Sequence, residues 1–174
     1  MTVLRPRRGA RALAAAVFVP LLMALAGCTI TFIGPEDGAS AGSSSRVIER
    51  FEVRGGNEFR VGQRIAFQIR TRVDGFVTLT SLGPNDRVEV FARNLRVVAG
   101  RTNVLDGSSV GQVFLVTPPR GDHRVRASFT TAPTDPGRVR FSGRVGETDW
   151  FAAIRIDIEP FPTTDVAETR FSVR

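Results

Sequence analysis

Hydrophobic and polar residues alternate with a period of two through most of the chain after residue 45. The clearest example is the run in which Ile65, Phe67 and Ile69 alternate with other, mostly polar residues. The same alternation recurs in runs at residues 51–54, 77–80, 88–90, 125–129, 154–158 and 171–173. Because successive side chains of a strand point to opposite faces, this pattern predicts antiparallel strands with one face in a core and one in water. The pattern predicts no convincing helix in this region.

Turn-forming residues separate the predicted strands. The strongest hairpin signal is Asp74-Gly75, because a type I′ turn needs positive φ at both central residues and this dipeptide adopts it readily. The dipeptide predicts a hairpin that joins a strand at 64–73 to a strand at 76–82. Several short strands at this spacing predict a β-sandwich or a barrel.

Two further segments add less regular strands. Residues 112–116 are hydrophobic almost without interruption, which suits a strand covered on both faces. Residues 137–149 predict an extra hairpin, with Val139 and Phe141 facing inward.

The first 28 residues follow a different pattern. Four arginines and no acidic residue come first, a hydrophobic run follows, and the run ends in Leu25-Ala26-Gly27-Cys28. This is the order of a secretory signal. The last four residues resemble the lipobox of bacterial lipoproteins. The resemblance implies that the thiol of Cys28 carries a diacylglyceryl group and that the chain is cut before this residue, which anchors the mature protein in a membrane.

Two other interpretations of this leader stay open. One is an uncleaved membrane helix, but its hydrophobic run of about 15 residues contains Pro20 and is short against the roughly 20 residues that a bilayer requires. The other is a plain secreted protein with a chance cysteine. If the lipobox is used, Thr29 in place of an aspartate after the cysteine favours the outer membrane over the inner one.

The composition predicts three segments. Residues 1–27 form the signal peptide, residues 28–45 a tether rich in glycine and serine, and residues 46–174 a single domain. The tether reaches at most about 60 Å when fully extended and about 23 Å on average as a random coil. With its one cysteine acylated, the chain has no thiol left for a disulfide or a metal site.

Charge argues against a nucleic-acid partner. Once the leader is removed, 20 arginines stand against 17 acidic residues, a net charge of +3, and the arginines are spread along the chain. A solvated surface of mixed charge explains this distribution. If their strands are neighbours, the outward arginines form a stripe that faces anionic lipid or a cell-wall polymer. These arginines are Arg64, Arg70, Arg72, Arg124, Arg126 and Arg155.

Residues 59–130 carry a series of motifs at turns and strand ends. They are Phe59-Arg60-Val61-Gly62-Gln63, Asp74-Gly75-Phe76-Val77-Thr78-Leu79, Pro84-Asn85-Asp86-Arg87-Val88, Phe91-Ala92-Arg93-Asn94, Val98-Ala99-Gly100-Arg101 and Pro118-Pro119-Arg120-Gly121. This series resembles a bacterial envelope family catalogued as domain of unknown function 4384. The resemblance implies an exported or lipid-anchored all-β module without an assigned catalytic activity. Together with the alternation it predicts an antiparallel, immunoglobulin-like β-sandwich of roughly seven to nine strands.

The sequence offers two candidate contact regions besides the arginines. The segment from Phe91 to Asn94 is either a recognition loop or a strand end with an asparagine turn. Trp150, the one tryptophan, is either an exposed contact residue or a plug at the end of a sandwich core.

Catalytic and metal chemistry find little support in the sequence. His123 follows Asp122, but adjacent residues of an extended segment point in different directions, and the chain has no Gly-x-Ser-x-Gly elbow. We therefore expect His123 to be a solvated turn residue before a strand. With one histidine, zinc is not expected, and no cofactor motif is present. Calcium would need carboxylates that converge from several turns. Aspartates commonly help to form turns, and this is the simpler explanation of their positions. These carboxylates are Asp74, Asp86, Asp106, Asp122 and Asp135.

The sequence thus predicts an envelope lipoprotein whose sandwich is a non-catalytic binding or structural module. Its expected partners are the membrane, through the lipid, and an envelope protein or a cell-wall polymer. One alternative is an accessory factor for the assembly or export of envelope proteins that works through an exposed strand edge. The other is a glycan-active enzyme of the envelope, for which the sequence names no acid/base pair.

Overall fold

The structure, a computed structural model, describes residues 46–174. The predicted signal peptide, the lipobox residues Leu25, Ala26, Gly27 and Cys28, and the tether lie outside the described residues. Strands make up 47% of the described part and helices 12%, so the predicted β class is confirmed in its coarse form. The helix that accounts for most of the 12% is not predicted by the sequence.

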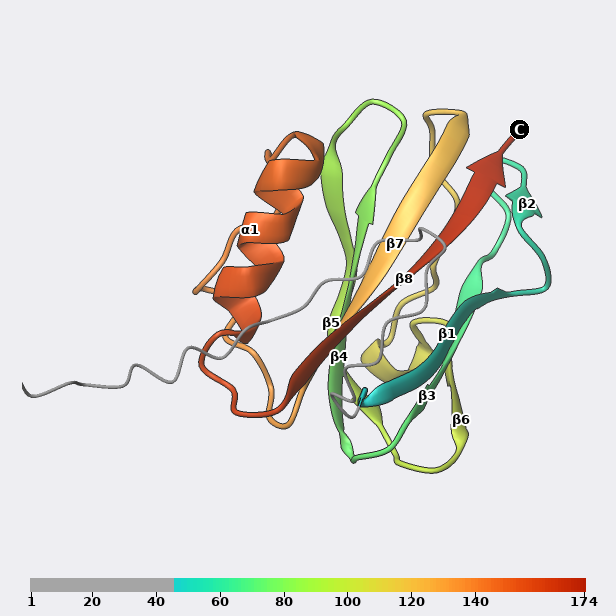
Figure 1. Cartoon of the computed structure of the whole chain (residues 1–174). Coiled ribbons are helices and arrows are strands. Elements are labelled where there is room, and N and C mark those ends of the chain that lie inside the picture. Colours follow the sequence, from blue (N-terminus) through green and yellow to red (C-terminus); the bar gives the residue numbers. More distant parts are fainter. Residues whose placement is uncertain (1–45) are drawn as a thin grey trace, which may run out of the picture. The chain divides into compact units, whose positions relative to one another are not determined.

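Eight strands form two sheets within residues 46–174 (Figure 1). The smaller, which we call sheet A, is antiparallel and has the order β1-β3-β6, with β1 (Ile48–Arg54), β3 (Ala66–Thr71) and β6 (Thr102–Leu105). The larger, sheet B, has the order β2-β8-β7-β4-β5, with β2 (Glu58–Phe59), β4 (Gly75–Leu82), β5 (Val88–Val97), β7 (Gly121–Thr130) and β8 (Thr164–Val173). Strand β2 runs parallel to β8, and the other pairs of sheet B are antiparallel.

Two helices complete the described chain. The 3₁₀-helix η1 (Ser108–Val110) follows β6, and the α-helix α1 (Gly146–Ile158) lies between β7 and β8 in the sequence. Figure 1 shows α1 on the side of sheet B that faces away from sheet A. Within residues 46–174, no helix is long and apolar enough to cross a bilayer.

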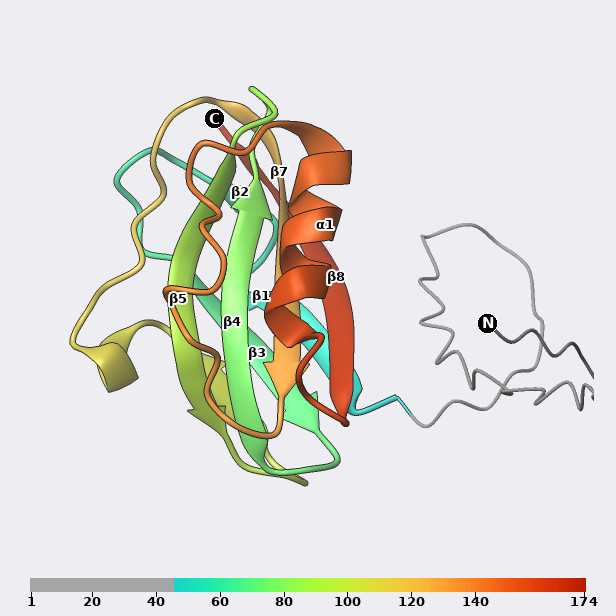
Figure 2. The same ribbon diagram turned by 90° about the vertical axis from the view of Figure 1, so that its left-hand side faces the viewer.

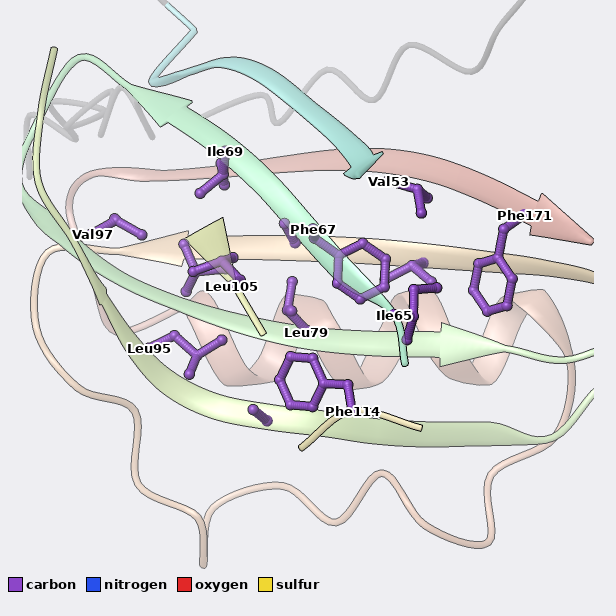
Figure 3. Close-up of a cluster of buried hydrophobic side chains, with 14 of the residues drawn as sticks. Val53, Ile65, Phe67, Ile69, Leu79, Leu95, Val97, Leu105, Phe114 and Phe171 are labelled. Carbon is purple, nitrogen blue, oxygen red and sulfur yellow. The ribbon is translucent and has the colours of Figure 1, made fainter. Parts of the chain in front are cut away.

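The main core lies between the two sheets. Phe67 and Ile69 of β3 are fully buried and point toward Leu79 and other side chains of sheet B (Figure 3). Their polar neighbours in sequence point the other way, so the predicted alternation of β3 is confirmed. Full burial of each such side chain stabilises the fold by about 1.5–3 kcal/mol.

A second core lies between α1 and the outer face of sheet B (Figure 2). Helix α1 contributes Trp150, Ala153, Ile154 and Ile158 to it. The prediction of a strand at residues 154–158 is wrong. Isoleucines two residues apart fit the period of a strand, but the first and third are also four apart, which puts them on one face of a helix. Accordingly Ile154 and Ile158 are buried and Ile156 is exposed.

The helix also explains why some polar strand residues are buried. Thr78 and Thr80 of β4 alternate with hydrophobic residues and are therefore expected in water, but both are buried. Helix α1 packs across β4 and β7 and covers their side of the sheet. Both faces of β4 are thus inside the protein.

The predicted hairpin at Asp74-Gly75 is wrong. Strand β3 belongs to sheet A and β4 to sheet B, so the connection crosses from one sheet to the other. Neither residue has a positive φ, which a type I′ turn requires. Asp74 instead accepts a hydrogen bond from the backbone N–H of Ala99 (2.7 Å). Gly75 is needed for space, because a Cβ there would lie 2.5 Å from the carbonyl oxygen of Thr130.

The two irregular segments also differ from their predictions. In residues 112–116 the burial alternates, with Phe114 and Val116 inside and Leu115 outside, so this segment is not a strand covered on both faces. Residues 137–145 form no hairpin and run beside β5, where the backbone N–H of Val88 donates to Arg144. Val139 and Phe141 do face inward, as predicted, but toward the second core.

Candidate binding surface

The predicted contact segment from Phe91 to Asn94 is part of β5 and not a loop. The half-buried ring of Phe91 packs edge-on against Phe67, with 5.5 Å between the ring centroids. Asn94 adopts a positive φ of 57° where the register between β4 and β5 shifts. Its side chain exchanges hydrogen bonds with the backbone of Thr134, at 2.9 Å to the carbonyl oxygen and 2.8 Å from the N–H group. Both residues are therefore occupied in holding the fold.

The other predicted contact residues, Trp150, Arg124 and Arg126, do lie together. Trp150 is 0% exposed, so the interpretation as an exposed contact residue is wrong. It is a core residue, but it lies on α1 in the second core and does not plug the end of the sandwich core. Its indole N–H donates to the hydroxyl of Thr80 over 2.8 Å. The guanidinium carbon of Arg126 lies 4.2 Å from the centre of the indole ring and that of Arg124 lies 5.6 Å from it, within the range of cation–π contacts.

Two glutamates form ion pairs with these arginines. Glu168 of β8 accepts from Arg124 over 2.7 Å and from Arg126 over 2.9 Å, and Glu147 of α1 pairs with both arginines. Burial alone would raise the pKa of Glu168, but the hydrogen bonds and charge of the two arginines outweigh it and hold that pKa below its usual value. The hydrogen bond to Glu168 in turn raises the pKa of Arg124. This cluster fixes the N-terminal end of α1 to sheet B and presents no excess positive charge.

His123 is not the solvated turn residue that the sequence predicts. It lies in β7, is buried, and has its Nε2 2.9 Å from the carbonyl oxygen of Pro119. Its ring stacks on Phe171 with 5.1 Å between the centroids. Asp122 bonds to the hydroxyl of Ser172. Across the described residues, no group of three potential ligands is placed to hold a metal ion.

The outer face of sheet A differs from these sites because its charges are exposed. The strand register places its residues in rows. Arg50 of β1 lies opposite Arg70 of β3, which lies opposite Thr102 of β6. The next rows are Glu52, Gln68 and Val104, and then Arg54 and Ala66. Arg64, which precedes β3, forms a β-bridge with Leu115. We call this surface the open face, and it also includes Glu49 and Arg72, which form an ion pair over 3.1 Å.

The open face carries an excess of positive charge. Its five arginines, all exposed, are Arg50, Arg54, Arg64, Arg70 and Arg72, and its acidic residues are Glu49, Glu52 and Asp106, which follows β6. Hydrogen bonds from Ser108 and the charge of Arg54 hold the pKa of Asp106 below its usual value. Glu49 pairs with Arg70 (2.9 Å) as well as Arg72, and Glu52 pairs with Arg50 (2.7 Å). Within residues 46–174, neither Arg54 nor Arg64 forms an ion pair. Like charges directly opposite each other destabilise a sheet, so the pairing of Arg50 with Arg70 has a cost in stability.

The open face is the outer side of the three-stranded sheet A. Two hollows in the described surface lie elsewhere. One, of about 10 Å³, adjoins His123, and the other, a shallow one of about 640 Å³, lies between the start of β5 and residues 142–145. No residue of the open face lines either of them. Figure 1 shows α1 on the sheet B side of the molecule, so no strand or α-helix of the described chain covers the open face.

The sequence predicts only part of this surface. Of the six arginines in the predicted stripe, Arg64, Arg70 and Arg72 lie on the open face, whereas Arg124 and Arg126 lie against α1 and Arg155 lies on α1 itself. Arg50 and Arg54 are missed, although they alternate with hydrophobic residues in the same way. The pairing of β1 with β3 brings the two sets together, and strand pairing cannot be read from alternation alone.

The chain matches no known protein family, no curated protein and no solved structure. The resemblance of residues 59–130 to domain of unknown function 4384 therefore stays a prediction.

Proposed function

We propose that the protein is an envelope lipoprotein, held in the outer membrane through Cys28, whose β-sandwich is a non-catalytic module that binds an anionic component of the envelope. The lipobox at residues 25–28 and the tether after it support the anchor. The observation that carries the binding role is the open face, where five exposed arginines outnumber three acidic residues and no strand or α-helix of residues 46–174 covers them.

The proposal includes an immunoglobulin-like topology for the sandwich. In that fold, strands A, B and E share one sheet, and strands C, C′, F and G share the other. Strands β1, β3 and β6 fit the first set in chain order, and β4, β5, β7 and β8 fit the second. Helix α1 would then be an insertion in the connection between strands F and G.

The anchor and the open face act together in this proposal. A lipidated chain is confined to one surface, and its tether averages about 23 Å. Confinement raises the effective concentration of the domain near envelope components, so weak contacts become occupied without a deep pocket. The sequence predicts an envelope protein or a cell-wall polymer as the partner. A negatively charged partner fits the open face, because each contact with an arginine is then favourable.

Three measurements test the proposal. Mass spectrometry of the mature N-terminus should find acylated Cys28, and Cys28→Ser should release the chain from the membrane fraction. Crosslinking in intact cells should capture an envelope component through the open face. The double variant Arg54→Gln with Arg64→Gln should lose that product, because these two arginines are free of ion pairs within the described chain.

The matched control is Arg140→Gln with Arg155→Gln. It removes two exposed arginines that also form no ion pair within residues 46–174 and that lie outside sheet A. The proposal fails if Cys28→Ser still sediments with membranes at 1 M salt, where electrostatic docking is screened, or if both double variants lose the crosslinked product equally.

A further inference from the structure

We propose that the anionic component bound by the open face is the lipid headgroup layer of the membrane itself, so that the domain lies on the bilayer with sheet A toward it. This inference rests on the binding role proposed above and names the partner of that site.

The arrangement of the side chains favours a broad partner. A small ligand is usually held in a cleft that surrounds it. The open face consists of rows of side chains across three strands, and the two hollows described above lie away from it. Side chains that stand in rows and line neither hollow are presented together to a broad surface, and a bilayer is such a surface.

The open face also mixes cationic and aliphatic residues. Val104 is 44% exposed and Leu115 is 48% exposed. Val104 lies in the row of Gln68, and Leu115 bridges to Arg64, so the two lie at the same edge of the face. Surfaces that rest on membranes combine basic side chains at headgroup level with aliphatic side chains that enter the boundary of the acyl chains. An anionic polymer in water would give these two residues no apolar environment.

The charges of the open face favour an anionic bilayer. Each arginine close to such a bilayer strengthens attraction to it by about fivefold, and the effect extends over about a Debye length. Neither Arg54 nor Arg64 has an ion pair within the described residues. Asp106 offsets part of the charge of Arg54, and the charge of Arg64 is available for headgroups. Because the lipid on Cys28 already confines the domain, these modest gains suffice to keep the face docked.

A fluorescent reporter on the anchored chain tests the inference. After acylation of Cys28 the chain has no other thiol, so a single introduced cysteine can carry an environment-sensitive dye. Val104→Cys places the dye on the open face. Ile156→Cys places it on the exposed side of α1, where the native residue is 42% exposed, close to the value for Val104.

The lipidated full chain is inserted into vesicles of neutral phosphatidylcholine, with or without about a third of anionic phosphatidylglycerol. We expect the dye at position 104 to shift to the blue on anionic vesicles only, and the dye at position 156 to stay unchanged. The shift should disappear at 1 M salt, where the Debye length is about 3 Å. In the Arg54→Gln, Arg64→Gln background the ratio of docked to undocked chains should fall at least tenfold.

The inference is overturned if the dye at position 104 shows the same emission on neutral and anionic vesicles, or if the dye at position 156 responds instead. It is also overturned if position 104 responds only when isolated cell wall or an envelope protein extract is added. Flotation of the vesicles reports separately whether the chain is anchored. If the chain does not float with the vesicles, the proposed anchor fails. Titration of the Cys28→Ser, Val104→Cys chain with anionic vesicles then shows whether the open face docks on the bilayer without the anchor.

Discussion

Arg93 and Asp157 form a buried ion pair that ties the edge strand β5 to helix α1. Nη1 of Arg93 lies 3.1 Å from Oδ1 and 3.2 Å from Oδ2 of Asp157, and Nη2 donates to the carbonyl oxygen of Val139 over 2.7 Å. The side chain of Arg93 is 15% exposed and that of Asp157 is 0% exposed. The shift in register beside Asn94 places Arg93 on the side of sheet B that α1 covers.

Replacing one partner of this pair should be far more damaging than replacing both. Arg93→Met leaves the carboxylate of Asp157 buried without a cation, which is expected to lower the free energy of unfolding by about 3–5 kcal/mol. Arg93→Met with Asp157→Leu should recover most of that loss, because an apolar pair of similar size fills the site. Urea unfolding of both variants, followed by circular dichroism, gives the comparison. Additive losses in the double variant would show that the two side chains are not coupled.

The same site should give a pH dependence with a defined sign. Burial raises the pKa of Asp157 above its usual 3.8, although the hydrogen bonds and charge of Arg93 act in the opposite direction. A pKa that is raised in the folded state contributes stability at low pH that is lost as the pH rises through it. Because Arg93→Met removes the lowering effect, its deficit should shrink as the pH falls toward about 4. A deficit that is constant between pH 7 and pH 4 would contradict this account.

Trp150 should report whether α1 is docked on sheet B. It is the one tryptophan of the chain and is fully buried, so its emission should be blue in the native protein and shift to the red when α1 detaches. Trp150→Phe keeps a ring in the second core but leaves the hydroxyl of Thr80 without its donor, at an expected cost of about 1–3 kcal/mol. Adding Thr80→Val removes the unpaired hydroxyl and should restore part of the loss in a thermal unfolding experiment. No recovery would mean that packing of the indole, and not its hydrogen bond, holds the helix.

The sequence predicts the sandwich core better than the helix that lies on it. The alternation of Ile65, Phe67 and Ile69 is read correctly because one face of β3 is buried and the other is solvated. Thr78 and Thr80 mislead because a second layer covers them. The covering layer is α1, which the sequence predicts as a strand because its isoleucines fit the period of a strand as well as that of a helix. Without that helix, polar residues of β4 are expected to be exposed.

The candidate site shows the same limit at the level of pairing. The sequence predicts one stripe that contains both Arg64 and Arg124. In the structure, Arg64 lies on the open face and Arg124 lies against the indole ring of Trp150 on α1. What separates them is the sheet to which each strand belongs. The pairing of strands that are distant in sequence depends on how the sheets pack in the folded protein. Local alternation carries no information on this packing.

Gly75 should be intolerant of any side chain, for reasons of space. A Cβ at this position would meet the carbonyl oxygen of Thr130 at 2.5 Å and overlap the ring of Phe129, which is buried in the main core. Gly75→Ala is therefore expected to lower the free energy of unfolding by about 1–3 kcal/mol. The control is Gly137→Ala, where the Cβ would meet only the end of the Asp135 side chain at 3.3 Å and the change should stay within about 0.5 kcal/mol. Equal effects of the two substitutions in urea unfolding would exclude a steric role for Gly75.

Glu168 should make the protein sensitive to acid. Burial alone would raise the pKa of Glu168, but Arg124 and Arg126 hold it below the usual 4.5. A pKa that is lowered in the folded state contributes stability above the unfolded value, and this stability is lost as the pH falls through the folded pKa. Between pH 5 and pH 3 the wild-type chain should thus lose more stability than Glu168→Gln, which has no carboxylate to protonate. Urea midpoints measured across this range give both slopes.

The matched control for this pH dependence is Glu159→Gln. Glu159 pairs with Arg138 at 3.6 Å, but its side chain is 67% exposed, so solvent screens the pair and the substitution should leave the acid slope close to that of the wild type. The Glu168→Gln chain should also be less stable than the wild type at pH 7, because two guanidinium groups then share only the carboxylate of Glu147. If Glu159→Gln flattened the acid slope as much as Glu168→Gln, the sensitivity would arise from the overall charge of the domain and not from the cluster that holds α1.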